Sequence, residues 1–150
     1  MTAGAPLSFR RLSREDCALW TEALFWLSIA TAAVRCVPFR YIAAFLVLPV
    51  NPTTSDETVQ LEMTGRVRWA VRSCARRAPW HPLCFAQGLA AHLMLRIRRI
   101  PCTVYFGAAH NDGEHLSAHV WVRSLGVGVV GEEMASRFAV LATFTSGPVV

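Results

Sequence analysis

The sequence predicts an α+β fold in which helices come first and an antiparallel sheet follows. Up to about residue 99, apolar residues recur with the period of a helix, and proline-containing segments interrupt the pattern. After Pro101 the period changes to two, as in "CTVYFG" and "LSAHVWVRS". With 150 residues, of which 53% are hydrophobic and 17% charged, the chain can form one domain with a substantial core, and the composition excludes a disordered chain.

The N-terminal region is predicted to be helical and unusually apolar. Ser13 and Asp16 form a pattern typical of a capping box, so a helix is expected to begin there and to end before Pro38. A second, shorter apolar segment covers residues 41 to 48. The apolar run from 17 to 34 is shorter than the roughly 20 residues of a membrane span and contains Glu22. We therefore expect a helical hairpin that packs on the domain, on a partner or on a membrane surface.

The segment "PVNPTTSD" is the clearest linker in the chain, because it combines two prolines with residues that cap helices. We place a boundary there, between an N-terminal apolar region (1–54) and a main domain (55–150). Two further helices are expected, one from Ser55 to the break at "RRAPWHP" and one from about Leu83 to Arg99. Their predicted inward stripes are Val59, Met63, Val67, Ala70 or Val71 and Cys74, then Ala86, Leu89 or Ala90, Leu93 and Ile97.

Four short strands are predicted to form the sheet: residues 102–107, 116–124, 127–130 and 137–144. Gly107 is expected to begin a polar loop, "AAHNDGEH". On the second strand, alternation places His119, Trp121 and Arg123 on one face and the residues between them on the other. Antiparallel pairing then brings residues about a dozen apart in sequence side by side.

Charge and cysteine content exclude several classes of protein. The net charge is +5, but the 15 basic residues are all arginines, scattered and not interleaved with aromatic residues, which argues against nucleic-acid binding. The five cysteines are odd in number and form no CxxC pair, so neither a disulfide framework nor a metal site is predicted. The start of the chain does not resemble a signal peptide, so a cytoplasmic protein is expected. No cofactor is expected either.

Cys84, His119 and an acid near residue 132 are the candidates for chemistry. Cys84 follows Pro82 at the expected start of a helix, where free N–H groups and the helix dipole favour a thiolate. His119 lies on an otherwise apolar strand and needs a polar partner there. Glu132 or Glu133 follows the next strand and could orient the imidazole, and Glu132 is the preferred choice.

Each of these residues also has a plain structural interpretation. A cysteine in an apolar helix is usually an inert core residue, and a strand histidine is usually a satisfied structural group. The other histidines, His81, His92, His110 and His115, are expected on the surface or in loops. The order of a helix-start cysteine, a strand histidine and an acid is nevertheless typical of papain-like and transglutaminase-like cysteine catalysts.

The segments "APWHPLCFAQGLAAHLMLRIRRIPCTVYFGA", "AHVWVRSLGVGVVGEE" and "RFAVLATF" resemble the transglutaminase-like cysteine protease domain of lasso-peptide maturation, over about residues 59 to 144. The resemblance is to the small stand-alone leader peptidase, and the apolar N-terminal region with "VPFR" is similar too. It implies Cys84 as nucleophile and His119 as base. The family's third residue is an aspartate about a dozen positions after the histidine; here Glu132 stands thirteen positions on. "CFAQG" also departs from the usual C-L-x-R-S.

The resemblance implies a cysteine peptidase that removes the leader from a ribosomally made lasso-peptide precursor through a thioester. It also implies a separate leader-recognition protein and an ATP-dependent macrolactam ligase as partners. An acyltransferase on the same fold and a non-catalytic peptide-binding or scaffold protein remain as alternatives from other functional classes.

Overall fold

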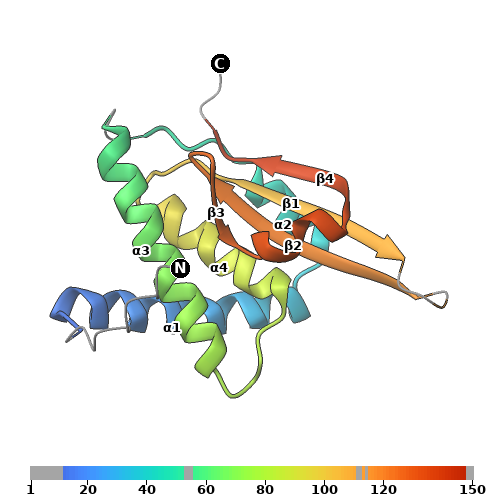
Figure 1. Ribbon diagram of the computed structural model, residues 1–150, viewed down its shortest axis with the longest axis horizontal. Coiled ribbons are helices and arrows are strands. Elements are labelled where there is room, and N and C mark those ends of the chain that lie inside the picture. The colour runs from blue at the N-terminus through green and yellow to red at the C-terminus, as the bar shows by residue number, and fades with distance from the viewer. Residues whose placement is uncertain (1–11, 53–55, 111–112, 114, 148–150) are drawn as a thin grey trace, which may run out of the picture.

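The computed structural model describes residues 12–52, 56–110, 113 and 115–147. Four helices precede a four-stranded antiparallel sheet, so the predicted α+β class is confirmed (Figure 1). The elements in chain order are α1 (Arg14–Cys36), α2 (Phe39–Leu46), α3 (Glu57–Arg77), α4 (Cys84–Ile97), β1 (Thr103–His110), β2 (Leu116–Ser124), β3 (Val127–Val130), the 3-10 helix η1 (Glu132–Arg137) and β4 (Ala139–Thr145).

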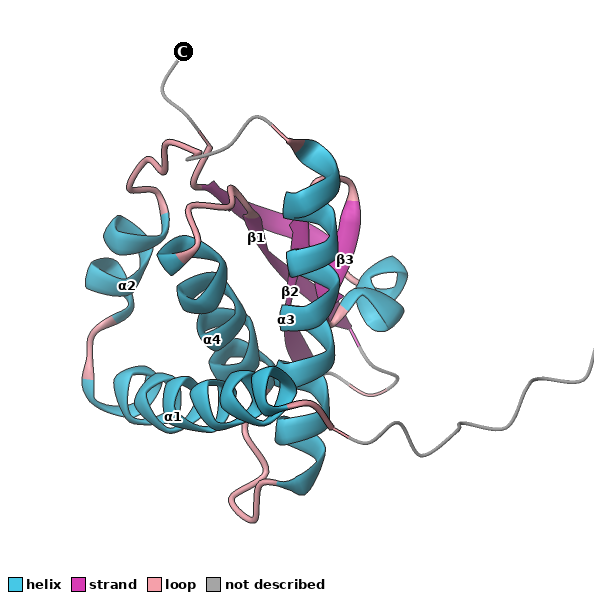
Figure 2. Ribbon diagram, turned by 90° about the vertical axis from the view of Figure 1, so that its left-hand side faces the viewer, coloured by secondary structure: helices cyan, strands magenta, loops and turns pink. Residues whose placement is uncertain are grey.

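The strands lie in the order β3-β2-β1-β4, and helices cover one face of the sheet. Helix α4 packs closely on that face: a Cβ added to Gly88 would come within 3.0 Å of Val120 and 3.4 Å of Val122. Figure 2 shows α1, α2 and α4 on one side of the sheet and η1 on the other, with α3 alongside β3. Val120 and Val122 therefore point toward α4, and the alternate residues of β2 point toward η1.

Helix α1 begins and packs as the sequence predicts. Ser13 and Asp16 form the expected capping box, with both side-chain-to-backbone distances at 3.1 Å. Glu22 pairs with Arg98 at the end of α4 through two contacts of 2.6 and 2.7 Å. The inward residues of α1 join the same hydrophobic core as α3, α4 and the sheet: Leu19, Ala23, Leu27 and Ala30. The two sides of the predicted boundary at residue 54 thus share one core.

Helix α1 also has a long exposed apolar side. By length and composition alone it could cross a membrane, but Leu27 and its neighbours on one side are buried in the core. Exposed aromatic and aliphatic side chains continue from α1 into α2: Phe25, Ile29, Val37, Phe39 and Tyr41. We call these five residues the α1–α2 apolar surface.

The predicted inward stripes of α3 and α4 are confirmed in the middle of each helix and wrong at one end. Val59, in the first turn of α3, is 54% exposed, and Ile97, the last residue of α4, is 57% exposed. Gln60 and Thr64 are buried at the start of α3 instead, and the Thr64 hydroxyl donates to the Gln60 carbonyl at 2.8 Å. At these two helix ends the buried side therefore differs from the side that the apolar period predicts.

Three element boundaries differ from the prediction. Helix α2 begins two residues early, directly after Pro38, whose fixed φ suits the start of a helix. Strand β1 continues through His110, where a loop was expected, because its later residues still pair with β2. The segment "GEEMAS" forms η1, which delays the start of β4 to Ala139.

Candidate active site

Cys84 is the first residue of α4, which confirms its predicted place at a helix start. The N-cap residue, Leu83, is extended and has no side chain that could bond the first N–H groups. Gln87 turns its side-chain amide toward the Pro82 carbonyl at 2.9 Å, so it offers a donor to the segment before the helix. The backbone donors at the start of α4 therefore remain available to a thiolate or to a developing oxyanion.

His119 lies on β2, half-buried, and is held by a backbone carbonyl. Its Nε2 is 2.8 Å from the carbonyl oxygen of Gly131, twelve residues on. A carbonyl can only accept, so Nε2 carries the hydrogen and Nδ1 is the nitrogen left unprotonated in the neutral ring. Gly131 has φ of 75°, in the left-handed region, and a Cβ there would come within 2.5 Å of the Val120 carbonyl. A glycine is thus required at this turn.

Glu132, the predicted acid, lies against an arginine. Its Oε1 is 3.5 Å from Nε of Arg123, and its side chain packs over Gly128, where a Cβ would approach within 2.5 Å. Its Oε2 is buried, and none of the described residues forms a hydrogen bond with it. Glu133 forms an ion pair with Arg72 of α3. The polar partner of His119 is thus the carbonyl of Gly131. The two glutamates lie against arginines instead, Glu132 against Arg123 and Glu133 against Arg72.

The sequence predicted a carboxylate beside His119, whereas the structure places the carbonyl of Gly131 there. The signal that could have found it is the glycine in "VVGEE", at the end of a strand whose partner carries the histidine. A glycine there allows the chain to turn over the sheet and bring its carbonyl to the ring.

The thiol and the imidazole are not brought into contact. Helix α4 packs on the face of β2 that carries Val120, whereas His119 points to the face that η1 covers. Among the described residues, no hydrogen bond joins Cys84 to His119. The dyad of Cys84 and His119 therefore stays a prediction, with each member in place on its own element.

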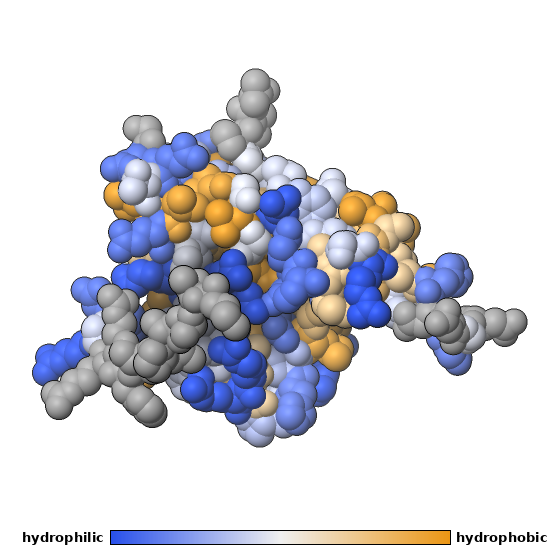
Figure 3. Space-filling model, in the orientation of Figure 1, coloured by the Kyte–Doolittle hydropathy of each residue, from blue (hydrophilic) through white to orange (hydrophobic). Residues whose placement is uncertain are grey.

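A row of aromatic rings links His119 to a hollow at the other end of this face. Phe138 stacks on His119 with ring centroids 5.0 Å apart, and His119 stacks against Trp121 at 6.0 Å. Trp121 lies parallel to Tyr105 of the neighbouring strand at 5.4 Å. On this side of the molecule, apolar residues gather over part of the sheet, with hydrophilic residues beside them (Figure 3).

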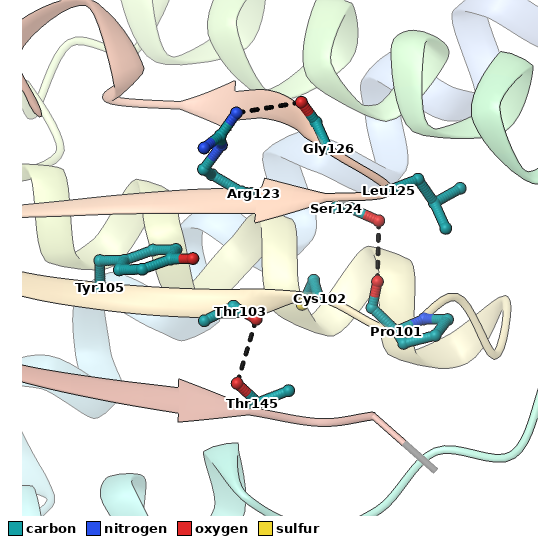
Figure 4. Close-up of a pocket in the computed structure, with 9 residues that line it drawn as sticks. All are labelled: Pro101, Cys102, Thr103, Tyr105, Arg123, Ser124, Leu125, Gly126 and Thr145. Carbon is teal, nitrogen blue, oxygen red and sulfur yellow. Dashed lines mark hydrogen bonds between the residues drawn. The ribbon is translucent and has the colours of Figure 1, made fainter.

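The hollow at the end of that row has a volume of about 260 Å³ and lies across three strands. Figure 4 shows Tyr105 and Arg123, which line the hollow from neighbouring strands, and the hydrogen bond between the hydroxyls of Thr103 and Thr145. The Arg123 guanidinium donates to the Gly126 carbonyl at 3.0 Å. The hollow combines an aromatic ring, hydroxyl groups and a cation, which suits a polar segment of a peptide.

A second cysteine–histidine pair lies in the core. Nδ1 of His92 is 3.3 Å from Sγ of Cys102, and both residues are buried. The prediction of His92 as a surface or loop residue is therefore wrong: it is on the inner side of α4, where its ring also meets Phe45 at 5.6 Å. Burial lowers the pKa of His92 to about 4 and raises the pKa of the Cys102 thiol to about 11. Both groups stay neutral near pH 7.

Residues 23–143 match the transglutaminase-like superfamily, and the chain belongs to that superfamily. No curated protein and no solved structure matches the chain. The fold is consistent with the chemistry of a cysteine peptidase or an acyltransferase. In the described part of the chain, no group of three or more histidine, cysteine, aspartate or glutamate residues could hold a metal ion.

Proposed function

We propose that this protein is a cysteine peptidase that removes the leader from a lasso-peptide precursor, with Cys84 as the nucleophile. The observation that carries the proposal is the position of Cys84 at the uncapped start of α4, in a chain of the transglutaminase-like superfamily. The free N–H groups favour the thiolate, and the N–H of Cys84 itself can donate to the oxyanion of a tetrahedral intermediate.

In the proposed reaction, the Cys84 thiolate attacks the carbonyl carbon at the junction of leader and core. The C–N bond breaks, the imidazolium of His119 gives its proton to the leaving amine, and the leader remains as a thioester on Cys84. His119 then takes a proton from water, which attacks the thioester and releases the leader as a carboxylic acid. The unprotonated Nδ1 is the nitrogen for this role, because Nε2 donates to the Gly131 carbonyl. Cys84 and His119 must come together for these steps.

The alternatives differ in the fate of the thioester or in whether it forms. An acyltransferase would pass the leader's acyl group to an amine instead of water, and the product would contain that amine. A non-catalytic peptide-binding or scaffold protein is favoured by one observation, the lack of a hydrogen bond between Cys84 and His119 among the described residues. Cleavage of a precursor separates these functions directly.

Three partners belong to the proposal: the precursor peptide, a separate leader-recognition protein and the ATP-dependent ligase that closes the macrolactam. The α1–α2 apolar surface supports docking of such a protein, because its five large apolar side chains are exposed and exposed apolar surface can mark an interaction site. The same surface would also support a peripheral association with a membrane from the cytoplasmic side.

Mass spectrometry of a lasso-peptide precursor, incubated with its recognition protein and this enzyme, tests the proposal. We expect cleavage at one leader–core bond by the wild type and none by Cys84→Ala, with both chains equally folded by circular dichroism. Equal cleavage by both would remove Cys84 from the chemistry. If the precursor binds and neither chain cleaves it, the scaffold function is correct; an amine adduct would identify the acyltransferase.

A further inference from the structure

Helix α3 presents arginines along one side with too few carboxylates to neutralise them. Arg68, Arg72 and Arg76 succeed one another at intervals of four residues, so they lie on the same side of the helix about 6 Å apart. Like charges at this spacing oppose helix formation, so a bound anion would relieve their repulsion. We call these three residues the arginine row.

The row borders a hollow of about 370 Å³ that is lined by residues of α3 alone: Gly65, Arg68, Trp69, Arg72 and Arg76. Trp69 is 38% exposed, and nothing lies within 4 Å of the place where Gly65 would carry a Cβ. The site therefore combines space, an accessible aromatic ring and cations on one side of a helix. Such a combination suits an anionic chain that also has apolar or flat groups.

In the described part of the chain, three arginines outside the row lie close to acids: Arg66, Arg98 and Arg123. Arg98 pairs with Glu22, and Arg66 lies 3.5 Å from both Glu15 and Asp16. Within the row, only Arg72 has an ion pair in the described part of the chain. Arg68 donates to the Gly128 carbonyl at 3.1 Å, a neutral partner, and Arg76 is exposed.

The one ion pair in the row shows that a carboxylate fits against the middle arginine. Glu133 of η1 places its carboxylate on Arg72, the middle arginine. Alternate residues of an extended peptide are about 6.6 Å apart, close to the roughly 6 Å between successive arginines. Arg68 and Arg76 are therefore about 12 Å apart, and carboxylates four positions apart in an extended segment, about 13 Å, can meet both of them on either side of the carboxylate already present.

We infer that the arginine row binds an acidic, extended segment of the peptide substrate. The inference rests on the proposed peptidase function for the word substrate, and it names the chemistry by which that substrate is held. The position of the row suits this role. The 3-10 helix η1, which covers His119, contacts the row through Glu133. Helix α3 ends at Arg77, seven residues before Cys84. A segment held on α3 is thus anchored beside both elements that carry the candidate catalytic groups.

The test measures binding without chemistry, in full-length Cys84→Ala protein. The probe is a short fluorescein-labelled peptide with glutamate at alternate positions and serine between, and the readout is fluorescence anisotropy. We expect binding that weakens as salt is raised from about 50 to 150 mM, and that is lost for the same peptide with glutamine in place of glutamate. Arg68→Gln with Arg76→Gln should weaken binding about tenfold, or about threefold for each arginine.

Arg35→Gln in α1 is the control matched to each single substitution, Arg68→Gln or Arg76→Gln, because it removes one arginine charge from an exposed position on another helix. It should change the affinity by less than about twofold. Equal weakening by the control would show a net-charge effect and would overturn the inference, as would an unchanged affinity in the double variant. Tighter binding of a short single-stranded oligonucleotide at the same salt would also overturn it, in favour of a nucleic-acid site. Because Cys84 is absent throughout, these results do not depend on whether the protein is a peptidase.

Discussion

Two combinations of a cysteine and a histidine can be compared in this protein: Cys102 with His92, which are in contact, and Cys84 with His119, the proposed catalytic pair, which are not. Cys102 and His92 touch, at 3.3 Å, inside the core. Cys84 and His119 are both half-buried, and no hydrogen bond joins them. The pair in contact is the less suited to chemistry, because burial keeps the Cys102 thiol and the His92 imidazole neutral. Proximity alone therefore does not identify a catalytic thiol.

The surroundings explain the difference. Around Cys102, Ser146 satisfies the backbone: it accepts from the Cys102 N–H at 3.2 Å and donates to the Cys102 carbonyl at 3.1 Å. Burial raises the pKa of the Cys102 thiol more than the Ser146 hydroxyl and the Arg96 charge lower it, so the sulfur stays neutral. Cys84 stands instead at the positive end of a helix dipole, and His119 is held with Nδ1 unprotonated by the Gly131 carbonyl. The surroundings of the buried pair suit packing, whereas those of Cys84 and His119 suit the proton transfer that we propose for them.

Replacing the two histidines should give the largest contrast between the pairs. His119→Ala should lower the rate of leader cleavage by about 10² to 10⁴, the usual contribution of a general acid–base group. His92→Leu, in protein shown to be folded, should keep the rate within about threefold, since His92 lies inside the core. Single-turnover kinetics measures both. A large loss in His92→Leu with an unchanged His119→Ala would reverse the assignment of the two pairs.

The buried pair should reveal itself in the pH dependence of stability. The folded-state pKa of His92, about 4, lies below the usual value of 6.5, so between these pH values the unfolded chain binds a proton that the folded chain does not. The contribution is present above pH 6.5 and is lost as the pH falls toward 4. It amounts to about 3 kcal/mol, and urea unfolding at several pH values measures it.

His92→Leu is the control for this pH effect, because it removes the titrating group and keeps an apolar side chain of similar size in the core. Its free energy of unfolding should fall less steeply between pH 6.5 and 4 than that of the wild type. Parallel curves for the two chains would show that His92 is not the group responsible.

Gly131 affects both the stability of the fold and the position of His119, and a comparison of Gly131→Ala with Gly126→Ala separates the two effects. Gly131→Ala and Gly126→Ala impose a similar backbone cost, because both residues have φ near 75°. Only Gly131 is crowded: a Cβ there meets the Val120 carbonyl at 2.5 Å, whereas nothing lies within 4 Å at Gly126. We expect Gly126→Ala to lower the free energy of unfolding by about 1 kcal/mol and Gly131→Ala by about 2 to 3 kcal/mol.

Cleavage should show the same distinction. Gly131→Ala should reduce the rate because its carbonyl moves away from Nε2 of His119, while Gly126→Ala should leave the rate unchanged. Equal rates in the two variants would mean that the carbonyl does not position the imidazole.

Glu132→Gln should have the smallest effect on cleavage, less than about threefold, because the Glu132 carboxylate lies against Arg123 rather than His119. The isosteric change keeps the packing over Gly128 and removes only the charge. A kinetic comparison at one pH suffices. A loss of a hundredfold or more would instead make Glu132 the third member of the catalytic group, as the sequence suggested.

The order of helices and strands could be predicted because each element carries a clear apolar period or a clear breaker. The capping box at Ser13 and the change of period after Pro101 located the first helix and the sheet. The alternation of β2 predicted that His119 and Val120 point to opposite faces of the sheet, and the close approach of Gly88 to Val120 confirms it. These features depend on residues close together in sequence.

The partners of the candidate site could not be predicted, because they depend on how distant segments meet. The hydrogen bond of His119 is accepted by a backbone carbonyl. Every residue has such a carbonyl, so no residue type in the sequence indicates which one His119 contacts. The burial of His92 results from α4 being covered by α1 on one side and by the sheet on the other. A polar residue on a helix that is enclosed in this way cannot be distinguished by periodicity from one that faces solvent.

The central claim, that Cys84 is the chemically active thiol, is tested most directly by alkylation of the folded protein with iodoacetamide near pH 7. Peptide mapping by mass spectrometry gives a rate for each of the five cysteines. Cys17 and Cys36 are exposed and set the rate of an ordinary thiol, whereas Cys84 is only half-buried and Cys102 is buried. We predict that Cys84 reacts faster than Cys17 and Cys36 despite its lower exposure, and that the buried Cys74 and Cys102 react slowest. A rate for Cys84 at or below that of Cys36 would contradict the claim.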